Sequence, residues 1–382
     1  MPSQLIRSQF NNKYTVLLLS IAFVLSGVSS VRAQWEMIDI QSKAPMRAVH
    51  TLTPTLCWIG SSGGNILKTK DGGKTWTTYH LPDSDSLDFR DIHAFSSEVA
   101  LAMSAGLSQD GKARIYRTED GGQHWELVYS TTQPDVFLDG LSFWNKKRGI
   151  CQGDPVNGRF FILLTQDGGK TWTELPEASR PVAQDHEACF AASGTSLITY
   201  GKGMAFFGTG GAKQARIMRS LDYGTSWEAI TTALPAGPSS GVFGLHFSSA
   251  KQGIAVGGDY KQTDEEAPNV LTTSDGGATW SLQKATVPAG LKECVAQYKM
   301  TNKTWNGQTQ IRKDNKILVA VGPSGTSLSF DKGYSWKELD QQPFHSASFA
   351  GSIGFAVGAA GRVGKITRLS PVKKTRRRLR LD

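Results

Sequence analysis

The chain has 382 residues, and its 41 glycines and 10 tryptophans are typical of an all-β protein with many tight turns. Its formal net charge of +9 is concentrated at the ends, where residues 1–33 carry +3 and residues 371–382 carry +5. The remaining +1 on residues 34–370 gives no support for nucleic-acid binding, which normally needs a strongly basic surface.

The N-terminus has the pattern of a secretory signal peptide. Arg7 and Lys13 precede an apolar run over residues 14–28, which is short for a membrane span, and residues 31–33 resemble a cleavage site. We therefore expect export to the periplasm or the extracellular space, with a mature protein that starts near Gln34. No later segment is apolar enough to form an integral membrane segment. An uncleaved N-terminal anchor is the alternative.

An eight-residue motif occurs six times along the chain. Its pattern is Ser/Thr-x-Asp-x-Gly-x-(Ser/Thr/His)-Trp, and its tryptophans recur every 47 to 56 residues. The copies occupy residues 69–76, 118–125, 165–172, 220–227, 273–280 and 329–336. Repeats of this length predict that each copy marks one supersecondary unit of a larger array.

The chemistry of this octet is that of a stabilised turn. Its glycine permits the positive φ that a tight hairpin requires. Its aspartate can accept hydrogen bonds from backbone N–H groups of the turn, and its tryptophan offers a large apolar surface for packing. Because six equivalent carboxylates cannot all be catalytic, we assign the octets a structural role.

Each repeat contains four predicted strands. In the first repeat they span residues 47–52, 56–60, 65–69 and 76–79, so that the octet joins the third strand to the fourth. Four strands about every 50 residues are typical of a β-propeller blade.

Six octets nevertheless predict seven blades. Residues 346–349, 354–358 and 363–369 match the first three strands of a blade, but no octet follows them. Residues 34–38 resemble an outer strand and can complete that blade. We therefore predict an all-β, seven-bladed propeller over residues 34–370, with the last blade closed by the N-terminal strand.

The basic residues 371–382 are predicted to form a disordered tail. A contact between this tail and anionic lipid, or an acidic patch of a partner, is the alternative.

The four cysteines show neither metal-binding nor C-x-x-C redox spacing. Cys57, Cys151, Cys189 and Cys294 lie in apolar, strand-like runs, so we expect buried free thiols. If the compartment is oxidising, Cys151 and Cys189 are the candidate disulfide pair. The chain also lacks a glycine-rich dinucleotide fingerprint. We predict no cofactor and no metal site.

Candidate functional residues come from the propeller face opposite the octets. Strand direction places on this face the loops that enter the first strands and the loops that join second to third strands. These loops carry the predicted ligand-binding residues Arg47, Arg90, Asp91, Asp139, Asp154, Arg159, Glu187, Arg216, Asp259 and Tyr260. Arginine forks can clamp a carboxylate or phosphate, and the carboxylates can orient them or act as acid and base.

Other polar residues on the same loops are less specific. Asp185-His186-Glu187, Lys292-Glu293 and His345 also enter predicted first strands. We interpret His186 and His345 as polar loop residues. Ordinary loop polarity and ion pairs between blades are the alternative explanation for the whole set.

The octets resemble the Asp box, or bacterial neuraminidase repeat. Together with the signal and the blade count, Thr69-Lys70-Asp71-Gly72-Gly73-Lys74-Thr75-Trp76 and the preceding Arg47 resemble the photosystem II stability/assembly-factor-like propellers. The similarity covers nearly all of residues 35–370 and is greatest to the non-photosynthetic bacterial branch, whose members carry labels such as glycosyl hydrolase. It implies a binding or assembly role. Sialidases, which share the Asp box, typically have an N-terminal Arg-Ile-Pro, and the sequence has none.

Two functions follow as hypotheses. The first is an exported, monomeric binding protein that recognises a protein or an anionic or glycan ligand on the channel face. The alternative is a glycoside hydrolase that uses the channel-face carboxylates. Two carboxyl groups about 5–10 Å apart in a sugar-sized cleft would favour the hydrolase.

Overall fold

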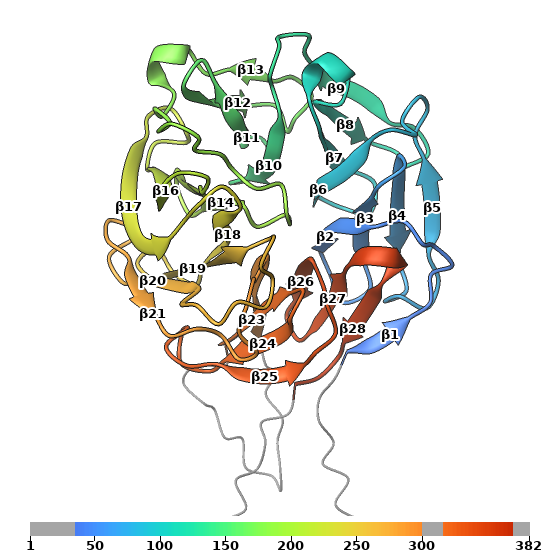
Figure 1. The fold of residues 1–382 in the computed structure, drawn as a ribbon. Helices are drawn as coiled ribbons and strands as arrows, with labels where there is room; N and C mark the ends of the chain where they lie inside the picture. Colours follow the sequence, from blue (N-terminus) through green and yellow to red (C-terminus); the bar gives the residue numbers. More distant parts are fainter. Residues whose placement is uncertain (1–34, 300–315, 370–382) are drawn as a thin grey trace, which may run out of the picture. The chain divides into compact units, whose positions relative to one another are not determined.

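The computed structural model describes residues 35–299 and 316–369. Their strands form seven four-stranded antiparallel sheets around a central channel, as Figure 1 shows. The predicted seven-bladed propeller is therefore confirmed. The predicted signal peptide and the predicted basic tail lie outside the described residues. Within the ranges described, no helix is long and apolar enough to cross a membrane.

The first four blades follow one another along the chain, each built from inner to outer strand. Blade 1 consists of β2 (Met46–Thr51), β3 (Cys57–Ser61), β4 (Asn65–Thr69) and β5 (Thr77–His80). Blade 2 consists of β6 (Asp88–Ala94), β7 (Ala100–Ala105), β8 (Arg114–Thr118) and β9 (Glu126–Ser130). Blade 3 consists of β10 (Leu138–Phe143), β11 (Gly149–Val156), β12 (Arg159–Thr165) and β13 (Thr173–Glu174). Blade 4 consists of β14 (Leu197–Tyr200), β15 (Met204–Gly208), β16 (Gln214–Ser220) and β17 (Glu228–Pro235).

The remaining blades complete the ring. Blade 5 consists of β18 (Ser240–Phe247), β19 (Gly253–Asp259), β20 (Val270–Thr273) and β21 (Ser281–Gln283). Blade 6 consists of β22 (Cys294–Lys299), β23 (Lys316–Gly322), β24 (Gly325–Ser329) and β25 (Lys337–Asp340). Blade 7 consists of β26 (Ser346–Ala350), β27 (Ile353–Val357), β28 (Val363–Ile366) and β1 (Glu36–Ile38). Three short 3-10 turns lie in the connections: η1 (Ser108–Asp110), η2 (Glu177–Ser179) and η3 (Ala359–Gly361).

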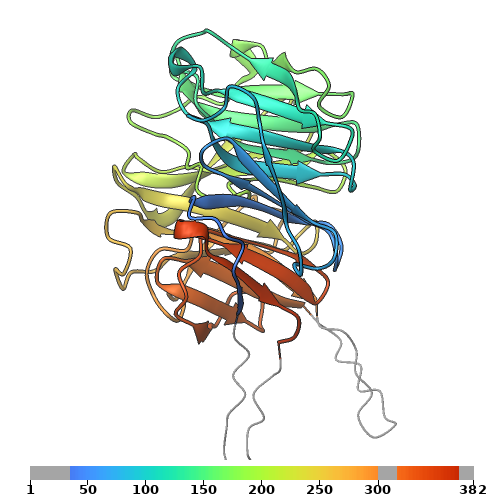
Figure 2. The same cartoon turned by 90° about the vertical axis from the view of Figure 1, so that its right-hand side faces the viewer.

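Blade 7 is closed by the N-terminal strand, as predicted. β1 pairs antiparallel with β28, with Glu36 opposite Lys365. Trp35 anchors this strand, because its ring is buried against Phe344 and its Nε1 donates a 2.9 Å hydrogen bond to Thr326 Oγ1 in blade 6. Figure 2, which views the ring from the side, shows the N-terminal strand beside the C-terminal blade.

The core lies between neighbouring blades. Trp58 of blade 1 and Phe89 of blade 2 belong to one buried cluster, and Ile150 of blade 3 and Phe207 of blade 4 belong to another. Middle strands are covered on both faces, which explains why they are apolar along their length: all six residues of β7 are buried. Apolar packing between blades therefore holds the ring together.

The octets form the turns between third and fourth strands. In blade 3, Asp167 Oδ1 accepts 3.0 Å hydrogen bonds from the backbone N–H groups of Lys170 and Thr171. Thr165 Oγ1 donates to the same oxygen at 2.8 Å. Gly169 has a φ of 79°, which a side chain would disfavour. The octet is thus a self-contained turn, as its sequence indicates.

Asp167→Ala should therefore destabilise the protein by about 1–3 kcal/mol, because several N–H groups of the turn lose their acceptor. Urea unfolding of the variant measures this loss. Lys146→Ala, at an exposed position of the same blade, is the control and should leave the unfolding midpoint unchanged. Equal midpoints for both variants would show that the octet carboxylates do not stabilise the turns.

Candidate functional site

The inner strands of all seven blades line a central cavity of about 410 Å³. Its wall includes the half-buried imidazoles of His50, His93 and His246. Burial lowers the pKa of His50 and of His246 to about 4, so both are neutral at physiological pH. Asp91 lines this cavity, and the other nine predicted site residues do not.

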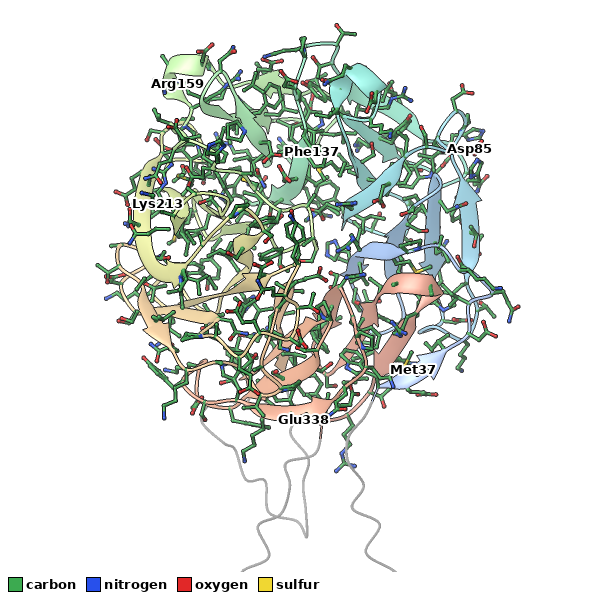
Figure 3. All side chains as sticks on the ribbon, viewed as in Figure 1. Met37, Asp85, Phe137, Arg159, Lys213 and Glu338 are labelled. Carbon is green, nitrogen blue, oxygen red and sulfur yellow. The ribbon has the colours of Figure 1, made fainter. Side chains whose placement is uncertain are left out.

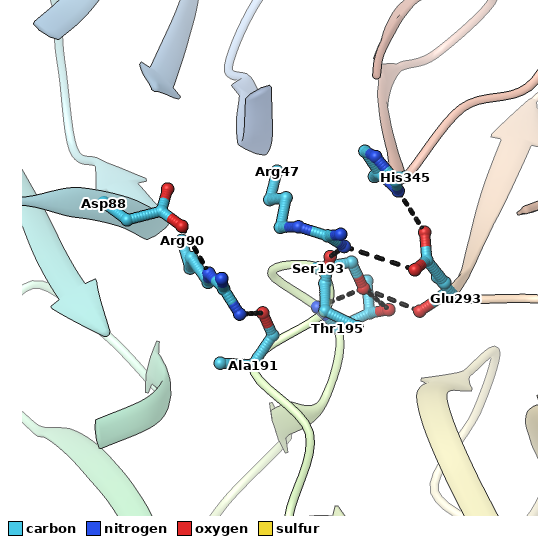
Figure 4. A network of polar contacts seen from close by, with 9 residues as sticks. Arg47, Asp88, Arg90, Ala191, Ser193, Thr195, Glu293 and His345 are labelled. Atoms are coloured by element: carbon cyan, nitrogen blue, oxygen red, sulfur yellow. Dashed lines mark hydrogen bonds and ion pairs between the residues drawn. The ribbon is translucent and has the colours of Figure 1, made fainter. Parts of the chain in front are cut away.

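A loop of blade 4 crosses the channel mouth on the face opposite the octets. We call residues 188–196 the mouth loop. Arg47 Nη1 donates to Ala192 O at 3.3 Å, and Arg90 Nη1 donates to Ala191 O at 3.4 Å. Ser193 Oγ donates to the carbonyl of Glu293 at 2.8 Å. Figure 4 shows how arginines from blades 1 and 2 meet this loop.

The mouth loop changes the expected position of Glu187. The sequence analysis places Asp185-His186-Glu187 at the entry to an inner strand, but that strand is β14, which begins at Leu197. The mouth loop intervenes. Its carbonyls at Ala191 and Ala192 accept from arginines of other blades, its Thr195 carbonyl accepts from Leu245 N of blade 5, and Ala188 pairs with Gly210 in its own blade. Those contacts cannot be deduced from the local sequence pattern.

The two arginines at the channel mouth have different acidic partners. Arg47 Nη1 lies 3.2 Å from Glu293 Oε1, and Glu293 in turn accepts a short hydrogen bond from His345 Nδ1. Arg90 Nε donates to Asp88 Oδ2 at 2.7 Å. The arginine side chains remain 25% and 33% exposed, respectively. Both guanidinium groups therefore stay accessible from the channel face.

Two predicted aspartates lie close to Cys189 of the mouth loop. Asp139, Asp154 and Cys189 each have a ligand atom within 4.8 Å of the others. Burial, together with the neighbouring Asp154, raises the pKa of Asp139, and burial also raises the pKa of Asp154. Cys189 N donates to Asp154 Oδ1 at 2.8 Å. Asp139 Oδ2 is buried and has no hydrogen-bond partner among the described residues.

Asp91 connects two blades through backbone contacts. Its Oδ1 accepts a 2.8 Å hydrogen bond from Ile92 N on β6, and its Oδ2 accepts one of 2.8 Å from Leu141 N on β10. Burial raises the pKa of this carboxyl to about 7. Because both oxygens already have partners, Asp91 has the geometry of a connection between blades 2 and 3.

Glu187 and Arg216 form a buried ion pair within blade 4. Arg216 Nε donates to Glu187 Oε1 at 2.8 Å, and Arg216 Nη2 contacts Oε2. Thr209 Oγ1 also donates to Oε1, at 2.6 Å. The pair is closed to solvent and fixes the segment that leads into the mouth loop.

Of the last three predicted residues, Arg159 lies apart from the adjacent Asp259 and Tyr260. Arg159 donates to Arg180 O at 2.8 Å, and Figure 3 places it toward the outer edge of the ring. Asp259 Oδ1 accepts from Lys261 N at 2.7 Å within a turn. Tyr260 is 48% exposed, and its ring lies edge-on to Phe190, which stacks on Phe243 with centroids 4.0 Å apart. Tyr260 thus extends the mouth-loop surface, whereas Arg159 does not.

All four cysteines are free and buried. The candidate disulfide between Cys151 and Cys189 is therefore wrong. Cys151 packs in the core between blades 2 and 3, whereas Cys189 packs in the core between blades 3 and 4. The predicted buried free thiols agree with the structure.

Two members of this arrangement are absent from the predicted ligand-binding set. Glu293, which connects Arg47 to His345, stands at a strand entry, but nothing in its local sequence distinguishes it from other loop acids. Cys189 lies far along the chain from Asp139 and Asp154, so no short spacing indicates their proximity.

Comparison with known proteins adds an evolutionary context. No protein-family model matches the chain. The chain is similar to photosystem II assembly factors. It is 26% identical over 165 residues to the photosystem II assembly lipoprotein Ycf48 of Synechococcus sp. (strain CC9902), which is 41% of this chain and 46% of that protein. It is also 26% identical over 134 residues to the chloroplastic photosystem II stability/assembly factor HCF136 of Oryza sativa subsp. japonica. This match covers 35% of this chain and 30% of that protein. The matches thus span less than half of these relatives.

Solved structures show the same fold. The structure described as YCF48 bound to D1 peptide has a TM-score of 0.61 and 16% identity, over 87% of this chain and 95% of that one. YCF48 from Cyanidioschyzon merolae gives a TM-score of 0.62 and 15% identity, over 87% and 99%. An ancestral GH74 enzyme gives a TM-score of 0.57 and 11% identity, over 86% of this chain and 45% of that one. At these identities the likeness concerns the fold alone.

Proposed function

We propose that this protein is an exported binding or assembly factor that recognises an acidic protein segment on the channel face opposite the octets. One observation carries the proposal. Arg47 and Arg90, which come from adjacent blades, donate hydrogen bonds to two successive carbonyls of the mouth loop. The same surface can hold an extended chain of another protein. A structural relative described as bound to a peptide supports this direction.

The chemistry of the face suits acidic segments. A guanidinium group pairs with a carboxylate through two parallel hydrogen bonds. Arg47 uses Nη1 toward the described residues, which leaves its other nitrogens for a ligand. The exposed ring of Tyr260, beside Phe190, adds an apolar contact at the same surface. Arginine and aromatic side chains are both enriched at protein-binding surfaces.

The glycosidase alternative has less support. Glycoside hydrolases need two carboxyl groups that face the scissile bond. Asp91 lines the central cavity, but both of its oxygens accept backbone hydrogen bonds. Asp139 is buried beneath the mouth loop, and Glu187 is paired with Arg216. The similarity to a GH74 enzyme extends to the fold only.

Arg90→Ala should weaken peptide binding at least about tenfold while leaving the fold intact, because a partly exposed ion pair contributes only about 0–1 kcal/mol to stability. The probes are two pools of synthetic peptides, one acidic and one basic, with binding to the mature protein followed by fluorescence anisotropy. The wild type should prefer the acidic pool.

Arg159→Ala is the matched control, since it removes the same side chain at the outer edge of the ring. It should bind the acidic pool as the wild type does. Equal losses in the two variants, or equal binding of both pools by the wild type, would contradict the proposed surface.

A further inference from the structure

Asp139, Asp154 and Cys189, which we call the acid–thiol cluster, come from three separate segments. Asp139 lies on β10 and Asp154 on β11, and each stands where the strand register shifts. Such β-bulges redirect side chains out of the regular alternation. Cys189 comes from the mouth loop. The fold thus directs two carboxylates and a thiol to one buried point, with ligand atoms within 4.8 Å of each other.

The state of Asp139 points to a missing ligand. The residue is 1% exposed, and its Oδ2 has no hydrogen-bond partner among the described residues. Buried polar atoms in native proteins are almost always satisfied by protein, water or an ion. The nearby carboxylate of Asp154 increases the need for a positively charged ligand, because two buried acidic groups repel each other when ionised.

We propose that the acid–thiol cluster binds a divalent transition-metal ion of the zinc class. Asp139 and Asp154 supply carboxylate oxygens, Cys189 supplies its thiolate, and a water molecule completes a tetrahedral site. The thiolate selects zinc over calcium and magnesium, which prefer oxygen ligands alone. Tetrahedral zinc with these ligands requires ligand atoms about 3.3–3.7 Å apart. This separation is compatible with the 4.8 Å limit within which the three ligand atoms lie.

Charge balance favours the ion. Two carboxylates and a thiolate carry three negative charges, and a divalent cation leaves one. The ion would tie the first residues of the mouth loop to blade 3. The sequence analysis predicts no metal, because the three ligands lie too far apart along the chain to form a recognisable motif.

The test uses the mature protein, treated with a chelator and then titrated with Co²⁺, a spectroscopic substitute for Zn²⁺. Binding should produce the near-ultraviolet charge-transfer absorption of a cobalt–thiolate bond, and Zn²⁺ should displace it. Cys189→Ser should abolish the absorption. Cys57→Ser, which alters another buried cysteine in blade 1, should retain it. The absorption therefore reports on the proposed sulfur ligand.

Asp139→Asn tests the site independently of the thiol. Because asparagine keeps the shape and leaves one ionisable group fewer in the buried cluster, the metal-free variant should melt no earlier than the metal-free wild type. Its affinity for Zn²⁺ should fall at least about 100-fold, and its melting temperature should no longer rise with Zn²⁺.

Three results would each overturn the proposal. One is the lack of a cobalt–thiolate absorption in the wild type. Another is an absorption that survives Cys189→Ser. The third is a rise in melting temperature with Zn²⁺ that is the same in Asp139→Asn as in the wild type. If Cys189→Ser does not fold, the Asp139→Asn measurement decides.

Discussion

Deletion of residues 34–40 should open blade 7 and destabilise the ring by several kcal/mol. The deletion removes β1 and exposes the edge of β28, whose strand partner is lost. It also removes the buried indole of Trp35, and loss of such a side chain costs about 3–5 kcal/mol. Urea unfolding should show a much lower midpoint, and light scattering should show aggregation through the free edge.

Two point variants separate the contribution of the Trp35 side chain from that of the strand pairing. Trp35→Ala keeps the strand but removes the anchor, so it should account for most of the loss. Met37→Ser, on the same strand with a side chain 46% exposed, should change the midpoint little. A deletion variant that unfolds at the same urea concentration as the full mature protein would contradict closure by the N-terminal strand.

Arg216→Ala should destabilise the protein by about 3–5 kcal/mol at neutral pH. The substitution leaves the buried carboxylate of Glu187 without its cation, and removal of one partner of a buried ion pair is strongly destabilising. The remaining hydrogen bonds, from Thr209 Oγ1 to Oε1 and from Gln184 N to Oε2, satisfy both oxygens but supply no positive charge. Chemical unfolding monitored by tryptophan fluorescence measures the loss.

The double variant Arg216→Ala/Glu187→Gln should recover a large part of this stability, because the uncompensated charge is gone. Arg219→Ala is the matched control on the same strand: its partner Glu228 is exposed, so its loss should cost no more than about 1 kcal/mol. If Arg216→Ala proves as mild as Arg219→Ala, the pair is not a structural connection, and its place in a ligand site regains support.

The fold could be predicted because its decisive interactions are local. Each octet contains its own hydrogen bonds, such as those of Asp167 with Thr165 and Thr171, so its sequence specifies a turn without reference to the rest of the chain. The closing strand could be predicted because Trp35-Glu36 repeats the Trp125-Glu126 pattern of an outer strand. Period and turn chemistry together were sufficient to infer seven blades.

For the candidate site, the sequence predicts only the propeller face on which the residues lie. Strand direction correctly indicates that Arg47 and Arg90 lie near the channel mouth. It does not indicate what they contact, because their partners come from a distant loop. Arg47 of blade 1 donates to Ala192 O and Arg90 of blade 2 donates to Ala191 O, and both carbonyls belong to blade 4. Arg159 is assigned to the same face, but it follows a second-to-third connection at the start of β12 and lies toward the outer edge. Contacts between blades depend on side-chain direction, which periodicity does not encode.

The pairing of β1 with β28 also determines the order in which the propeller can assemble. Within most blades, each strand pairs with a neighbour a few residues away, so these sheets can form early. Among the described strands, those of blade 7 must be gathered from both ends of the propeller, because Glu36 of β1 lies opposite Lys365 of β28. Joining them carries the largest chain-entropy cost, and it comes last. Any partner that holds residues 35–38 away from β28 would therefore trap an open ring whose seventh blade lacks its outer strand.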